Sequence, residues 1–154
     1  MDAANVVQNS SATRIAAIAA GSTYFLGGFS SVGVPIVRLE VVAKAQSSQP
    51  KSLHLPPIDD VRIGQGSFDA GYVGAVAGQV LNDDPSMVIA GSNLSAVVFD
   101  RAGNVVGGGN GFVMGPLYPG ARIFFSVSAG FKAIPYPIAA GAQVSIEPNY
   151  QPAP

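Results

Sequence analysis

The amino-acid sequence predicts an all-β protein, and three observations support this fold class. Its apolar residues, rich in Val, Ile, Phe and Tyr, occur in short runs rather than in long amphipathic stretches. Turn-forming residues separate these runs, and the 154 residues include 19 Gly and 12 Pro. Within several runs apolar and polar residues alternate, which is the period of an extended strand and not of a helix. Together these features indicate short antiparallel strands joined by tight turns.

The clearest alternation predicts a strand at residues 36–45. Every second residue of this segment is apolar and shares one face, whereas the opposite face is largely charged and carries Arg38, Glu40 and Lys44. A strand with this pattern has one buried side and one solvated side.

Regular strand spacing begins at Tyr72. The reversal at residues 100–104 reads Asp-Arg-Ala-Gly-Asn, in which the Asp can cap its own turn and the Gly can supply a positive φ, so it indicates a β-hairpin. The glycine run at residues 107–111 is expected to form a mobile loop or a bulged edge. The predicted strands lie at residues 72–81, 93–99, 122–128 and 143–147, with one more that begins at residue 105.

The number and spacing of these strands are typical of an immunoglobulin-like antiparallel β-sandwich, which we expect over residues 59–154. Residues 1–45 would supply additional N-terminal strands. Two interpretations of that segment stay open, because it can belong to the same sandwich or be half of a preceding β-sandwich module. Residues 46–58, which are polar and rich in Pro and Ser, are expected to be a linker.

Three short motifs follow one another in the second half of the chain. They are Gly-Gln-Val-Leu-Asn at 78–82, Ala-Val-Val-Phe-Asp-Arg-Ala-Gly-Asn-Val-Val at 96–106, and Leu-Tyr-Pro-Gly at 117–120 before a Phe-Phe pair. This succession resembles the FxLYD family, the immunoglobulin-like domains of bacterial and archaeal envelope proteins. The resemblance covers roughly residues 72–146, and it departs at Ala96, which stands in an aromatic slot, and at the glycine-rich insert after Val106. It implies an immunoglobulin-like fold and a non-catalytic adhesion, spacer or accessory role.

Composition excludes several classes of function. The 8 basic side chains are scattered singly along a chain that also has 9 acidic ones, so no positive stripe is available for nucleic acid. The long uncharged stretch between Arg14 and Arg38 is interrupted by Gly, Ser and Pro, so we expect no membrane span. The chain has no Cys, which excludes disulfides and thiolate chemistry.

Catalytic residues are not evident in the sequence, so we expect no enzyme. The single histidine, His54, lies in a Pro-rich connection, and no Gly-x-Ser-x-Gly motif accompanies it. A carboxylate-dependent hydrolase is the less favoured alternative. It would draw its acid and base from Asp60, Asp69, Asp83, Asp84 and Glu147.

No cofactor is expected, although the acidic turns allow a calcium site. Carboxylates in loops are the hard oxygen ligands that Ca²⁺ prefers, but the spacing of an EF-hand is absent. The candidate ligands are Asp59, Asp60, Asp83 and Asp84.

Four aromatic residues beside Pro or Gly are candidates for binding a protein or glycan partner. Flat rings at strand ends can stack on sugars or anchor a partner, and they can equally plug the end of a sandwich. These residues are Tyr118, Phe131, Tyr136 and Tyr150.

The sequence therefore predicts a non-catalytic immunoglobulin-like module of an extracellular or cell-envelope protein, acting in adhesion, spacing or assembly. The alternative is a structural coat or appendage subunit that forms homo-oligomers by strand pairing. Only 11% of the residues are charged, and uncharged edge strands can pair with another chain.

Overall fold

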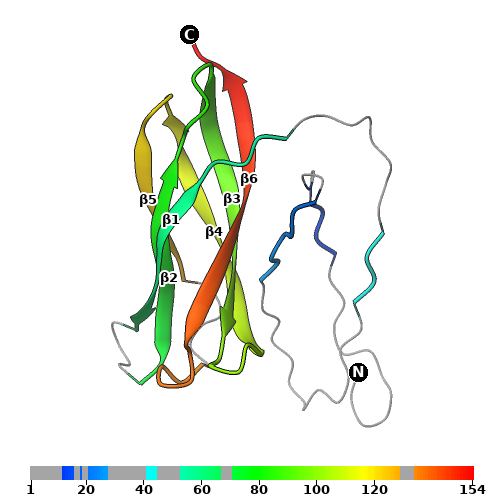
Figure 1. Cartoon of the computed structure of the whole chain (residues 1–154), viewed down its shortest axis with the longest axis vertical. Coiled ribbons are helices and arrows are strands. Elements are labelled where there is room, and N and C mark those ends of the chain that lie inside the picture. Colours follow the sequence, from blue (N-terminus) through cyan, green and yellow to red (C-terminus); the bar gives the residue numbers. More distant parts are fainter. Residues whose placement is uncertain are drawn as a thin grey trace.

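The computed structural model describes residues 12–15, 18, 21–27, 41–44, 53–66, 71–128 and 134–154. Over these residues the protein is an all-β sandwich, with six strands in two antiparallel sheets that pack face to face (Figure 1). One sheet has the order β1-β2-β5 and the other β4-β3-β6. The strands are β1 Ile58–Gln65, β2 Val73–Leu81, β3 Met87–Phe99, β4 Val105–Leu117, β5 Arg122–Val127 and β6 Gly141–Pro152.

This strand order corresponds to that of an immunoglobulin-like sandwich. In that plan strands A, B and E form one sheet, and strands C′, C, F and G form the other. Here β1, β2 and β5 correspond to A, B and E, and β4, β3 and β6 correspond to C′, C and F. The described strands include none at the position of G, so β6 pairs only with β3 and lies at the edge of its sheet.

The core lies between the two sheets, and alternation along each strand selects its members. In β3, Leu94, Ala96 and Val98 point into the core, so Ser95 and Val97 point to the opposite face of the sheet. The buried apolar residues that these three meet come from every strand but β1, and they include Val76, Val80, Val113, Leu117, Phe125, Val127 and Ile146. The predicted period-two burial is therefore confirmed for this half of the chain.

The predicted hairpin at residues 100–104 is also confirmed. The Asp100 carboxylate accepts hydrogen bonds from the backbone N–H groups of Ala102 and Asn104, each at 2.8 Å, and Gly103 has a φ of 83°. The hairpin joins β3 to β4, which is longer than the sequence predicted, because the glycine run at 107–111 is part of β4. The loop interpretation of that run is wrong and the edge interpretation is right, since β4 is an edge strand.

Strand β1 was not predicted, since Asp59 and Asp60 were expected to lie in a loop. Ile58, Val61 and Ile63 nevertheless pack against the core, and the strand pairs with β2 through a bulge at Asp60, whose φ is 53°.

The prediction of a strand at residues 36–45 is not met where the structure describes that segment. Residues 41–44 form no strand, and Val41 and Val42 are 83% and 78% exposed. The rest of the segment lies outside the described residues. The described residues before Leu53 form no strand and pair with no sheet. No helix in the described part of the chain is long and apolar enough to cross a membrane.

Candidate functional site

The predicted binding aromatics do not form one surface. Tyr118 lies in the β4–β5 turn and is 52% exposed. Tyr150 lies near the end of β6 at the same end of the sandwich, whereas Tyr136 lies in the β5–β6 connection at the opposite end. Tyr136 and Tyr150 pack against the core, as expected of residues that plug the sandwich ends. Phe131 lies outside the described residues.

The four predicted calcium ligands are each engaged with other groups. Asp59 accepts a hydrogen bond of 2.8 Å from Arg122, and Asp60 accepts one of 2.9 Å from Gln79. Asp83 contacts His54, and the bonds of Asp84 are described below. Within the described residues no group of three or more His, Cys, Asp or Glu could hold a metal ion. The structure does not bring these carboxylates together as a metal site.

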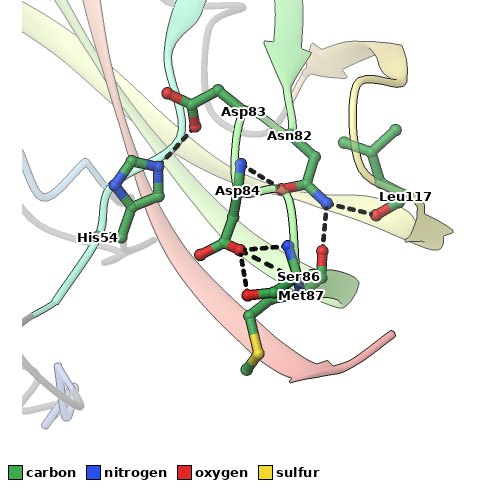
Figure 2. A network of polar contacts seen from close by, with 7 residues as sticks. All are labelled: His54, Asn82, Asp83, Asp84, Ser86, Met87 and Leu117. Atoms are coloured by element: carbon green, nitrogen blue, oxygen red, sulfur yellow. Dashed lines mark hydrogen bonds and ion pairs between the residues drawn. The ribbon is translucent and has the colours of Figure 1, made fainter. Parts of the chain in front are cut away.

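A polar network ties the β2–β3 turn to the β4–β5 turn (Figure 2). Asn82 is fully buried, and its Nδ2 donates to the carbonyl oxygens of Met87 and Leu117, each at 2.8 Å. Its backbone also exchanges bonds with the β4–β5 turn, from Gly120 N–H and to Ala121 C=O. This asparagine, which belongs to the first FxLYD-like motif, therefore has a structural role.

Asp84 closes the same turn. Its Oδ1 accepts from the backbone N–H and hydroxyl of Ser86 and from the N–H of Met87, at 2.8 to 3.0 Å (Figure 2). The hydrogen bonds from Ser86 hold the pKa of Asp84 below its usual value. Next to it, His54 Nε2 lies 2.5 Å from Asp83 Oδ1, which anchors the connection before β1. The network holds chain segments together, and one oxygen of each of these two carboxylates is engaged in it.

The face of the β4-β3-β6 sheet that points away from the core is covered by residues 21–27, here named the arm. The backbone N–H of Phe25 donates to Ser145 Oγ at 2.7 Å, and that of Gly27 donates to Ser95 Oγ at 2.5 Å. Ser95 returns a hydrogen bond to the Gly27 carbonyl oxygen at 3.3 Å. Ser95 and Ser145 are direct neighbours on β3 and β6, so the sheet offers a pair of hydroxyls to the arm's backbone.

The arm lies so close to the sheet that side chains are excluded at the contact. A Cβ at Gly27 would lie 1.8 Å from the Ala96 carbonyl oxygen, and one at Gly108 would lie 2.8 Å from the Gly27 Cα. The Phe25 ring meets Phe99 edge to face, with centroids 6.0 Å apart. Here the glycine run of β4 lets the arm approach the sheet.

Tyr24 of the arm is partly buried at this contact. Burial raises the pKa of its hydroxyl to about 12, and the negative charge of Glu147 on β6 adds to the effect.

One side of the sandwich lies between the edge strands β1 and β6, which contact each other there. A groove of about 230 Å³ lies there, lined by Ile58 of β1, Val144 and Ile146 of β6, Leu55 and Pro56 before β1, and residues 18 and 22–24. Its lining combines these apolar side chains with the hydroxyl-bearing residues Ser22, Thr23 and Ser145. Along β6 the chain has no charged residue and no Pro from Gly141 to Ile146. This uncharged edge with its groove is the candidate functional site.

Sequence reasoning missed these features, although one signal was available. Ser95 and Ser145 stand in the middle of apolar strands, and a small hydroxyl at such a position can bind a passing backbone. The unpaired edge of β6 in the described sheet could not be predicted, because it depends on which strands become neighbours.

Comparison with protein families, curated proteins and solved structures gave no match. The structure thus defines the chain by its fold class, as an all-β sandwich protein.

Proposed function

We propose that this protein is a non-catalytic immunoglobulin-like module of an envelope or secreted protein, and that it acts in assembly by strand pairing. The single observation that carries the proposal is the open, uncharged edge of β6, where the immunoglobulin plan has a further strand. An unpaired edge presents a row of backbone donors and acceptors that another chain can extend.

Strands β1 and β5 are less suited to pairing. Strand β1 carries Asp59, Asp60 and Arg62 and is bulged at Asp60, and both features protect an edge. Strand β5 has only 6 residues.

Strand β4 is also an uncharged edge strand, and it contacts β5 along the opposite side of the sandwich. Edge strand β6 faces the groove instead, so it favours pairing.

Sedimentation velocity across a wide range of protein concentration tests the assembly role, because pairing predicts a mass that rises with concentration. Ala142→Lys should abolish the rise, since Ala142 packs against the core at the edge and a lysine there would be buried by an added strand. Asn149→Lys is the matched control, because it adds the same charge to β6 beyond Pro148 and should leave association unchanged. A strict monomer at every concentration would overturn the assembly role.

A further inference from the structure

We propose that residues 36–45 of one copy pair with β6 of a second copy and supply a strand at the edge where the described strands include none. This inference rests on the proposed assembly role and names its partner: a second copy of this chain, which contributes a specific segment.

The acceptor is the described edge of β6 with its groove. Residues 141–147 precede Pro148, which cannot donate to a ladder, and they span about 23 Å at about 3.3 Å per residue. Apolar side chains of an added strand would enter the groove beside Ile58 and Ile146, whereas its other side chains would face solvent beside Gln143.

The donor fits this acceptor in pattern and in length. Alternate residues of 36–45 are apolar, and Leu39 and Val41 share that face, whereas Arg38, Glu40 and Lys44 lie on the other. A strand in the position of G needs this alternation, with one face in the core and one in water. Ten residues are enough to cover the pairable part of β6.

The donor has no partner strand in its own chain where the structure describes it. Residues 41–44 are exposed, and they lie on the far side of the arm from β6 (Figure 1). The strand-like alternation of residues 36–45 is complementary to the edge of β6, which has no second partner among the described strands. Exchange between copies would pair the two.

Single cysteines provide the first test, because the chain has no native Cys. One sample carries Gln143→Cys, and the other carries Arg38→Cys, Glu40→Cys or Val42→Cys, all on the face expected to be solvated. After mixing and mild oxidation, at least one donor position should give a disulfide-linked heterodimer on a non-reducing gel. Ser126→Cys, exposed on β5 of the other sheet, is the matched acceptor control. Equal yields with Ser126→Cys and Gln143→Cys would overturn the proposal.

A charge on the apolar face provides the second test. Leu39→Asp should weaken self-association roughly tenfold or more, because the carboxylate would enter the groove beside the apolar side chains of Ile58 and Ile146. Val42→Asp adds the same charge to the opposite face and should change association by less than about twofold. Circular dichroism confirms that each variant folds.

The outcomes separate this inference from the function on which it rests. If the protein associates with rising concentration, but Leu39→Asp leaves that association unchanged and Gln143→Cys gives no crosslink, the assembly role stands and residues 36–45 are not the donor. A monomeric crosslink within the double variant Val42→Cys, Gln143→Cys, with no heterodimer on mixing, would show that the chain completes its own edge and would also reject the inference. A strictly monomeric protein would reject both.

Discussion

The side-chain amide of Asn82 donates to the backbone carbonyl of Leu117 at 2.8 Å, and so joins two chain positions that are 35 residues apart. The same nitrogen donates to Met87, and the Asn82 side chain is fully excluded from water. One residue therefore satisfies backbone groups of two turns at one end of the sandwich. Because buried carbonyls lose their hydration on folding, this bond has a large effect when it is removed.

Asn82→Ala should lower the free energy of unfolding by about 2 to 4 kcal/mol, because it leaves two carbonyl oxygens unsatisfied and opens a small void. Urea unfolding followed by circular dichroism measures the change. Asn104→Ala removes an exposed side-chain bond to Asp100 and should cost no more than about 1 kcal/mol. Equal losses for the two variants would contradict the role given to Asn82.

The hydroxyl groups of two tyrosines should lose their protons only at high pH in the folded protein, in a late phase of the alkaline titration. Burial raises the pKa of Tyr150 to about 12, with Asp83 and Asp84 adding to the effect, and Tyr24 also rises to about 12. Since the folded pKa exceeds the unfolded value of about 10, the contribution to stability is complete below pH 10 and is lost as pH rises toward 12. Absorbance at alkaline pH should show this late phase, and it should vanish in urea.

Tyr150→Phe should remove part of the late phase without loss of stability. The buried hydroxyl of Tyr150 has no hydrogen-bond partner within the described structure, so its removal costs no bond and relieves desolvation. A decrease in the free energy of unfolding by more than about 1 kcal/mol would show that the hydroxyl is bonded.

Gly27→Val should release the arm, because a side chain at Gly27 would collide with the Ala96 carbonyl. We expect faster amide hydrogen exchange at Phe25 and Gly27, and a pKa of Tyr24 closer to that of a solvated tyrosine. Gly141→Ala is the control, since a Cβ there meets no atom within 4 Å. Unchanged exchange in Gly27→Val would contradict the close contact between arm and sheet.

Acid should weaken the two turns that carboxylates close. Hydrogen bonds from the side chain and backbone of Asn104 hold the pKa of Asp100 low, and those from Ser86 act likewise on Asp84. A lowered folded pKa stabilises the fold above the unfolded value of about 3.9, and the contribution is lost as pH falls through the folded pKa. Nuclear magnetic resonance titration should show that Asn104→Ala raises the pKa of Asp100 and leaves that of Asp84 unchanged.

Much of the fold was predictable because its strands obey local rules. Strand β2 and strand β5 lie within about a residue of their predicted bounds, and the capped turn after Asp100 forms as expected. Local rules failed where neighbours decide the structure. The glycines of β4 have no side chain to reveal burial, yet Gly108 contacts the arm. Strand β1 was hidden by Asp59 and Arg62, which are exposed charged residues within it.

The candidate site was less predictable than the fold. Its lining residues come from β1, β6, the connection before β1 and residues 18 and 22–24, so no motif within one segment predicts the site. The aromatic residues were reasonable candidates for binding a partner because of their residue type, but Tyr136 and Tyr150 pack against the core. An expected patch was thus divided between the two ends of the sandwich.

The hydroxyl pair beneath the arm determines part of the surface that the sheet would expose if the arm were released. The hydroxyl groups of Ser95 and Ser145 can form hydrogen bonds with water as readily as with a peptide group. The glycines beside them add no apolar side chains. Release of the arm would therefore expose hydroxyl groups beside Val97, which lies on the same face of β3. A mixed surface of this kind favours association less than a wholly apolar one.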